Sequence, residues 1–239
     1  MFALLKKEFN SFFASPIAYL VISVFLVVSG LFLWVFKGDF NILNAGFADL
    51  NNFFYLAPWL FLFLIPAITM KSFADEFSNG TIEILKTRPL TNWQIVMGKF
   101  WASLILIIVA LLPTLTYIYT VYVIGNPIGN IDMGSTIGSY IGLLFLAATY
   151  TAIGLFTSTL TKNQIISFIL AVFITFLVFY GFDALSSLYQ KNSFLIQKIG
   201  INQHFKSISR GVIDTRDIAY FISVTLFFLF ITKMQLTDE

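Results

Sequence analysis

The stretch Phe73–Phe100, FADEFSNGTIEILKTRPLTNWQIVMGKF, is a polar interruption between two long apolar segments. It holds six charged residues in a chain of 239 residues of which only 11% are charged and 58% are hydrophobic. A soluble domain is about half apolar and about a quarter charged. The composition therefore predicts an all-α polytopic membrane protein, and the quoted stretch is a polar connection between two of its spans.

Six apolar segments are long enough to cross a bilayer. A hydrocarbon core of about 30 Å requires about 20 apolar residues in a helix. Prolines at positions 58, 66 and 113 fall inside these segments and predict kinks. The predicted spans are Ile17–Phe36, Phe53–Met70, Trp101–Ile124, Ile137–Leu160, Ile165–Phe182 and Ile218–Thr232.

Several functional classes are excluded by composition. The net charge of +2 gives no nucleic-acid footprint, and there is no Cys for a thiol nucleophile or metal site. The lone His204 is more readily an ordinary interfacial residue than a catalytic base. Gly98-Lys99 is followed by Phe100, so no phosphate-binding loop exists. We therefore expect no catalytic, cofactor-binding or metal-binding residues, and the predicted spans carry no charge for an ion relay.

The residues before the first span predict a helix over 2–13 that lies in the membrane interface. Phe2, Leu5, Phe9 and Phe12 recur on one helical face, and the lysines at positions 6 and 7 lie on other faces. Pro16 interrupts continuity with the span, although a simple extension of the span is the alternative. The apolar run is too long for a signal-peptide core, so we expect the span to be retained.

The basic residues predict an orientation with both termini in the cytoplasm. With both termini in the cytoplasm, eight lysines and arginines lie in segments on the inner side and six on the outer side. The segment Lys71–Lys99 holds four of them, whereas Gly125–Thr136 holds none. Five of the six outer residues lie in the last loop, Asp183–Asp217, which is long enough to contain structure of its own; the sixth is Lys37.

The segment 71–99 contains signals for two helices. Gly80 precedes a short helix over Thr81–Thr87, with Glu83 at its third position, and Pro89 ends it. Thr91 and Gln94 then form a capping-box pattern that begins a helix over 92–124. This helix of about 50 Å exceeds the bilayer core, so its first turns, with Trp93 and Lys99, should reach the inner interface.

We expect the short helix to be a docking element on the cytoplasmic side. Ile82 and Leu85 form its apolar face, and the charged residues Glu83, Lys86 and Arg88 surround them. A solvated loop with incidental helicity is the alternative.

Two further patterns concern packing. Gly134, Gly138 and Gly142 recur every four residues and Gly154 follows, which favours close helix packing over the wall of a substrate path. In the last outer loop, Phe194, Leu195 and Ile199 share a helical face, and Phe205 and Ile208 continue it after a break at Gly200. This predicts one or two short helices dipping into the outer leaflet or a pair interface, rather than a flexible loop.

These motifs together resemble the ABC-2 type permeases over nearly the whole chain. The segment from Glu76 through Gly80-Thr81-x-Glu83-x-Leu85, Pro89-Leu90-Thr91 and Gly98-Lys99 is similar to their cytoplasmic coupling loop. The likeness extends to Leu5-Lys6-Lys7-Glu8-Phe9, Ser15-Pro16-Ile17-Ala18-Tyr19, Gly138-Ser139-Tyr140-Ile141-Gly142-Leu143, Ala152-Ile153-Gly154-Leu155-Phe156-x-Ser158-x-Leu160-Thr161-x-Asn163-Gln164 and Asn202-x-His204-Phe205 with Arg210-Gly211-Val212-Ile213-Asp214.

The resemblance implies a permease in a bacterial inner membrane, with no ATPase site of its own. A separate cytoplasmic ATPase would hold ATP and Mg²⁺ and would bind the short helix, with Glu76, Thr81, Ile82, Glu83, Leu85 and Lys86 in the coupling role. The permease would pair with a second copy or a related subunit near its first and fifth spans. The gliding-motility-associated members are most similar, which implies a GldA-like ATPase and a GldG-like membrane subunit. The family also has short re-entrant outer helices before the last span.

Two other functional classes remain open from the residues themselves. One is an ion-coupled carrier or lipid-moving protein that works without ATP, against which the charge-free spans argue. The other is an ATP-independent membrane anchor of a motility or secretion machine. An ATPase that stays bound during purification separates the permease from both.

Overall fold

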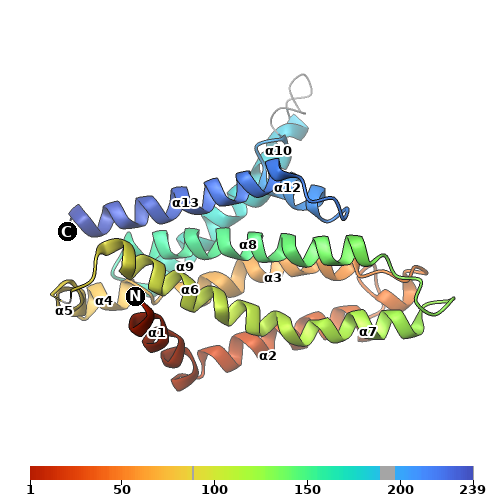
Figure 1. Cartoon of the computed structure of the whole chain (residues 1–239), viewed down its shortest axis with the longest axis horizontal. Coiled ribbons are helices and arrows are strands. Elements are labelled where there is room, and N and C mark those ends of the chain that lie inside the picture. The colour runs from red at the N-terminus through yellow and green to blue at the C-terminus, as the bar shows by residue number, and fades with distance from the viewer. Residues whose placement is uncertain (88, 189–196, 239) are drawn as a thin grey trace.

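The computed structural model describes residues 1–87, 89–188 and 197–238, and every regular element in them is a helix (Figure 1). Six helical segments are long and apolar enough to span a membrane, as predicted, and most extend beyond the predicted spans. They are Ile17–Val35, Asn51–Ser78, Asn92–Ile124, Met133–Thr159, Gln164–Ser187 and Thr215–Thr237.

The segments are built from individual helices that keep the labels of Figure 1. The first four long segments contain α2 (Ile17–Gly30) with the π-helical turn η1 (Leu31–Val35), α3 (Asn51–Thr69) with α4 (Ala74–Ser78), α6 (Asn92–Leu111) with η3 (Leu112–Thr114) and α7 (Leu115–Ile124), and α8 (Met133–Thr159). The last two contain α9 (Gln164–Phe176) with η4 (Leu177–Gly181) and α10 (Phe182–Leu188), and α13 (Thr215–Asp238). Short elements are α1 (Phe2–Ala14), η2 (Ile42–Asn44), α5 (Thr81–Lys86) and α12 (Ile201–Ile208).

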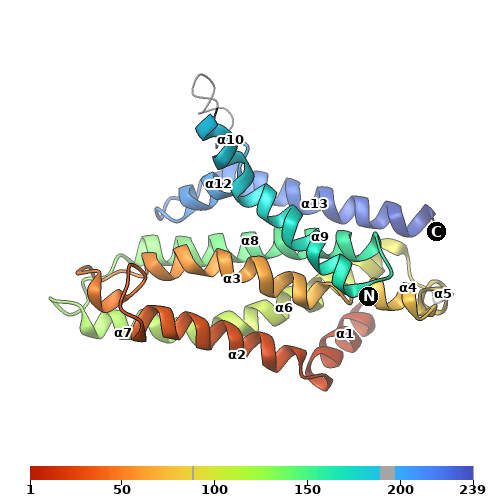
Figure 2. The same cartoon turned by 180° about the vertical axis from the view of Figure 1, so that it is seen from behind.

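Helix α8 forms the centre of the bundle, and α3, α6, α9, α12 and α13 pack against it. In its most apolar stretch, 72% of the residues are buried inside the protein. The corresponding share is 22% for the segment that begins with α9 and 28% for those that contain α2 and α13. Helices α9 and α10 lean away from the other helices (Figures 1 and 2). The two termini and the α4–α5 segment lie at one end of the molecule, which follows from an even number of crossings.

Local sequence signals set where the helices begin and break. The predicted capping box is present: the Gln94 N–H donates to the Thr91 hydroxyl at 3.3 Å, and the Thr91 N–H donates to the Gln94 side chain at 3.1 Å. Pro113 has no N–H to donate, and the long third segment tightens there into the 3₁₀ turn η3. Extended backbone at Ser15 before Pro16 separates α1 from α2.

Polar side chains join the helices inside the bundle. The hydroxyls of Thr149 on α8 and Thr225 on α13 lie 3.0 Å apart. The Tyr140 hydroxyl on α8 donates to the carbonyl of Thr114 at 3.0 Å. Such interhelical hydrogen bonds satisfy groups that hydrocarbon cannot hydrate, and they hold α8 in register with its neighbours.

The small residues predicted to permit close packing lie at three contacts of α8. A Cβ at Gly138 would stand 2.6 Å from the Ile208 carbonyl oxygen, and one at Gly142 would stand 3.1 Å from the Phe205 ring. A Cβ at Gly154 would overlap the Thr69 hydroxyl on α3. Gly134 makes its close contact through its backbone, which lies against Gly211.

The loop before the last span, Asp183–Asp217, contains most of α10 and the whole of α12, and α12 begins after Gly200. Phe205 and Ile208 are buried, and α12 lies against α8. The face predicted for Phe194 and Leu195 lies outside the described residues. His204 on α12 contacts two residues of α13. Its Nδ1 lies 2.7 Å from an Asp217 carboxylate oxygen, and its ring stacks on Tyr220 with centroids 3.9 Å apart.

We expect Gly138→Ala to destabilise the fold, because the new methyl group meets backbone atoms of Ile208 that cannot rotate away. Overpacking of this kind costs about 1–3 kcal/mol, more than the roughly 1 kcal/mol that Ala gains over Gly in helix propensity. The measurement is the thermal unfolding midpoint in detergent. Gly181→Ala is the control, since its Cβ meets only Leu177 at 3.6 Å. Equal midpoints for both variants would contradict this packing.

Candidate functional site

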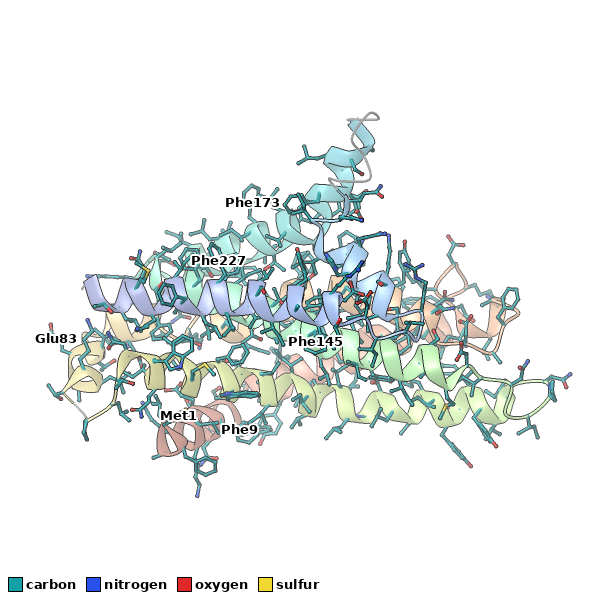
Figure 3. All side chains as sticks on the ribbon, turned by 45° about the horizontal axis from the view of Figure 1, so that its top comes forward. Met1, Phe9, Glu83, Phe145, Phe173 and Phe227 are labelled. Carbon is teal, nitrogen blue, oxygen red and sulfur yellow. The ribbon has the colours of Figure 1, made fainter. Side chains whose placement is uncertain are left out.

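The predicted docking helix is present as α5, at the end of the molecule that holds both termini. Gly80 precedes it with a φ of 68°, a left-handed conformation that glycine adopts without strain. Glu83 projects at the extreme end of the structure, beyond Met1 (Figure 3). The chain therefore presents a one-and-a-half-turn helix beyond its long helices.

The apolar face expected on α5 points the other way. Ile82 is only 8% exposed and belongs to the protein's own core, and Leu85 is half-buried against that core. Ile84 is 61% exposed. This corrects the expectation that Ile82 and Leu85 form the face presented to a partner, because Ile82 is buried in the protein's own core and Leu85 is half-buried against that core.

The charged and polar residues of α5 surround Ile84. Thr81 and Glu83 are exposed and Lys86 is half-buried. Arg88, the third charge predicted around the apolar face, lies outside the described residues. The exposed face of α5 is thus Ile84 with Thr81 and Glu83.

A buried cluster of charges includes a residue of α4, the helix that precedes α5 in the chain. The Lys99 ammonium on α6 is 2% exposed, and it donates to Glu76 on α4 at 2.8 Å and to Glu8 on α1 at 3.2 Å. The side chains of Glu76 and Glu8 are 13% and 16% exposed. We call Glu8, Glu76 and Lys99 the Lys99 cluster. It joins three helices at one ammonium group.

Two apolar contacts support the Lys99 cluster. The ring of Phe73, which is fully buried, lies 5.1 Å from the Lys99 ammonium, within the range of a cation–π interaction. Leu4 on α1 lies against Gly98, where a Cβ would stand 3.2 Å from its side chain. The glycine beside Lys99 thereby lets α1 approach α6 closely enough for Glu8 to reach the ammonium.

The two adjacent carboxylates of α4 connect it to different helices. Glu76 bonds Lys99, whereas Asp75 accepts a hydrogen bond from the Gln164 amide at the start of α9. Helix α4 continues through Asn79 and Gly80 into α5. The polar contacts of α4 therefore connect α5, through the chain, to α1, α6 and α9.

Helix α1 extends over Phe2–Ala14 and is amphipathic, close to the predicted 2–13. Of the residues predicted for its membrane face, Phe2 is 76% exposed, and Leu5, Phe9 and Phe12 are half-buried. Lys6 and Lys7 are exposed. Leu4, which the sequence pattern did not single out, is the buried residue of α1.

The chemistry of the site is electrostatic and mechanical. Within the described residues, no group of three or more His, Cys, Asp or Glu side chains is arranged to hold a metal. The Lys99 cluster is an ion network in which each carboxylate holds the ammonium from a different helix. Such a network positions helices relative to one another.

The whole chain was then compared with known proteins. A family model described as ABC-2 family transporter protein matches residues 2–230. The chain belongs to the ABC-2 transporter family. A comparison with curated proteins finds no significant match.

Members of the ABC-2 membrane family are the permease components of ABC transporters, and they lack an ATPase site. The match covers the α4–α5 segment, the first five long helices and the sixth as far as residue 230. An ABC-2 permease requires an ABC ATPase as its partner.

Sequence reasoning on this permease did not single out Glu8 or Ile84 as site residues. It placed Lys99 near the inner interface, and the structure adds that the Lys99 ammonium is buried and paired with two carboxylates. Its partners lie 91 and 23 residues away in the chain, so no local spacing reveals them. A lysine beside a glycine in an apolar helix was the available signal, because such a charge requires partners.

Lys99→Met is expected to lower the free energy of unfolding by about 3–5 kcal/mol, because it leaves two buried carboxylates without their cation. Lys99→Arg should retain most of the stability. The measurement is unfolding of the purified permease in detergent. Lys162→Met, at an exposed lysine, is the control. A Lys99→Met variant as stable as its control would mean that the Lys99 cluster contributes nothing to the fold.

Proposed function

We propose that this ABC-2 permease couples ATP hydrolysis by a separate cytoplasmic ATPase to export or mechanical work across a bacterial inner membrane. The observation that carries the proposal is the connection from the exposed α5 through Glu76 to the buried Lys99. The partner supplies ATP and Mg²⁺, and α5 receives its motion.

The docking contact is centred on Ile84. Burying an isoleucine side chain contributes roughly 1.5–3 kcal/mol, part of which offsets the ordering losses of association. Glu83 and Lys86 set register and association rate more than affinity, because Glu83 is exposed and Lys86 is only half-buried, so that solvent and salt screen both charges. Thr81 begins the helix and fixes its direction after Gly80.

Force applied at α5 passes through α4 to the membrane helices. Glu76 connects α4 to α6 and α1, and Asp75 connects it to α9. Helix α9 packs more loosely than the other spans and leans outward, so it has the most freedom to move. A tilt of α9 relative to the central α8 would open or close a path along the bundle.

The finer assignment is a GldF-like permease for gliding motility. Its partners would be a GldA-like ATPase and a GldG-like second membrane subunit, or a second copy of this chain. The motifs around Thr81–Leu85, Gly138–Leu143 and Asn202–Asp214 are those through which the chain resembles ABC-2 permeases, among which the gliding-motility-associated members are most similar. The pair would meet near α2 and α9, whose apolar faces are largely exposed.

An ATP-independent anchor of a motility machine is the second candidate, favoured by the extended buried core of α3, α6 and α8. An ion-coupled carrier fits less well. The Lys99 cluster lies at one end of the bundle and is internally paired, whereas a relay requires ionisable groups along the crossing.

Ile84→Asp is expected to weaken ATPase binding by about tenfold or more, because it places a carboxylate in an apolar contact. Permease abundance should stay near normal, since Ile84 supports no core. The measurement is co-purification of the ATPase with the permease at two salt concentrations. Ile128→Asp is the matched control, a 72% exposed isoleucine at the opposite end of the molecule.

Three companion variants sharpen this test. Ile82→Asp should lower permease abundance itself, because Ile82 is a core residue, and Leu85→Asp should lower both abundance and ATPase binding. Lys86→Gln should have little effect at physiological salt. A full ATPase complement on Ile84→Asp would reduce α5 to a connecting segment and direct the search for the docking site to α1.

The proposed orientation is tested with the cysteine-free chain as background. Single cysteines at Asn130 and Lys162 occupy exposed positions in loops at opposite ends of α8. An impermeant thiol reagent added to intact spheroplasts should label position 130 and not 162. Labelling of position 162 from outside would overturn the placement of both termini in the cytoplasm.

A further inference from the structure

The imidazole ring of His204 is held by two hydrogen-bonding contacts at the end of the bundle opposite the two termini. Its Nδ1 lies 2.7 Å from an Asp217 carboxylate oxygen at the start of α13, and its Nε2 lies 2.8 Å from the Lys198 carbonyl oxygen in the turn before α12. The side chains of His204 and Asp217 are only 17% and 8% exposed. His204 thus bonds α12 to the first turn of α13.

Both partners of the ring are hydrogen-bond acceptors. A carbonyl oxygen and an ionised carboxylate have no proton to donate. A neutral imidazole carries a single N–H, so one of the two short contacts would then set a nitrogen lone pair against an oxygen lone pair. An imidazolium has an N–H on each nitrogen and donates in both directions. The geometry therefore fits the charged form of His204 and conflicts with the neutral form.

Asp217 provides the negative charge that the imidazolium requires. It lies in the first turn of α13, where the dipole of a 24-residue helix favours an anion. Its Oδ2 atom is enclosed and accepts a hydrogen bond from no described residue. A charged donor is the strongest partner for a buried carboxylate. Loss of a proton from His204 would remove the charged donor that the structure places beside this carboxylate.

His204 is the side chain expected to change its charge near neutral pH. Histidine is the residue type whose ordinary pKa falls between about 5 and 8, and the chain contains a single histidine. Helix α8 meets α12 through glycines and serine hydroxyls. The charged and titratable residues around the ring on the other neighbouring elements are Asp217, Tyr220 and Arg216 on α13, Lys198 before α12, Lys206 on α12 and Asp183 on α10. These residue types have ordinary pKa values outside that range.

Helix α12 connects the fifth long segment to the sixth. The Asn202 amide on α12 donates to the Asp183 carboxylate on α10, and α12 also contacts η4. Through His204, the same short helix is bonded to α13. Helix α12 lies beside α10 and the start of α13 in both views (Figures 1 and 2). An outward movement of α10 from α13 must therefore break one of these two polar contacts.

We propose that His204, Asp217 and the Lys198 carbonyl form a pH-sensitive latch between α12 and α13. The imidazolium donates to both oxygens and holds α12 on α13 at low pH. As the pH rises, loss of a proton makes one of the two contacts repulsive and releases α12 from α13.

The latch regulates the outer end of the fifth span. Because α12 also holds α10, protonation of His204 restrains α10 and the helix α9 that precedes it. Acidity outside the membrane then closes this end of the bundle, and a rise in pH frees it. This consequence rests on the proposed function, which places the loop before α13 on the outer side and lets α9 tilt.

Imidazole ¹⁵N NMR of the full-length permease in detergent measures the protonation directly, because the single histidine gives one pair of ring signals. Both nitrogens should carry a proton at about pH 5, and one of them should lose it as the pH rises towards about 8. Asp217→Asn should lower the proton affinity of the ring by about tenfold or more, since the neutral amide stabilises the imidazolium less. Asp214→Asn, at an exposed carboxylate three residues earlier, is the matched control and should leave the transition nearly unchanged.

A ring that keeps one proton, or two, throughout this range would overturn the latch. Equal proton affinities in Asp217→Asn and Asp214→Asn would overturn it as well. The titration of the wild-type protein decides the first point without any variant, so it stands even where a substitution prevents folding.

The release of α12 is measured with spin labels on cysteines placed at Lys206 on α12 and Ile222 on α13, which are both exposed. The distance between the labels should broaden and lengthen as the pH rises in the otherwise wild-type chain. His204→Gln should show the broad distribution at every pH. The same narrow distribution at low and high pH would show that α12 is held without the imidazolium and would contradict the proposal.

Both measurements use the permease alone, and co-purification of the ATPase is followed on the same preparation. Loss of the pH response with the ATPase still bound would reject the latch alone. A permease that shows the pH response and binds no ATPase would reject the proposed function and leave the latch in place.

Discussion

Lys99 places an ammonium group in the interior at the point where α1, α4 and α6 meet. A buried ammonium must be paired, because its removal from water costs several kcal/mol in the absence of partners. The two carboxylates that pair it come from α1 and α4. Helix α1 also packs along α6, and α4 also contacts α9. The ion network adds to this packing a polar connection that joins α1 and α4 to the same group on α6.

The consequence is a polar junction at one end of an otherwise apolar molecule. Helix α4 lies between α5 and the bundle, and its two carboxylates reach helices that are far apart in sequence. An apolar contact slides easily, whereas a short charge-assisted hydrogen bond has a defined length and direction. A displacement of α5 can therefore pass through this junction to α1, α6 and α9. Side-chain repacking does not absorb the displacement.

The sequence predicted those features that depend on near neighbours in the chain. The six spans follow from runs of apolar residues, and the start of α6 follows from Thr91 and Gln94. The break at Pro113 and the glycine before α5 are also local. Features set by distant partners were not predictable in this way. The burial of Lys99 depends on Glu8, and the inward direction of Ile82 depends on how α5 folds back on the core.

The sequence pattern also did not predict that Ile84, rather than Ile82, points outward from α5. A six-residue helix has too few positions for periodicity to distinguish Ile82 and Leu85 from Ile84. The glycines of α8 were closer to prediction, because small residues at four-residue spacing commonly mark close contacts. Their actual neighbours, Ile208, Phe205 and Thr69, required the three-dimensional structure.

The most direct test of the account removes the charges of the Lys99 cluster together, with Glu8→Gln, Glu76→Gln and Lys99→Met in one chain. Replacing a buried ion triad by neutral groups is often tolerated, so the variant should fold and bind the ATPase through Ile84. Spin labels on cysteines placed at the exposed Gly38 and Val212 would report motion at the opposite end of the permease. ATP should change the distance between the labels in the wild-type complex and leave it unchanged in the triple variant. An equal ATP-dependent change in both would show that the motion of α5 reaches the membrane helices without the Lys99 cluster.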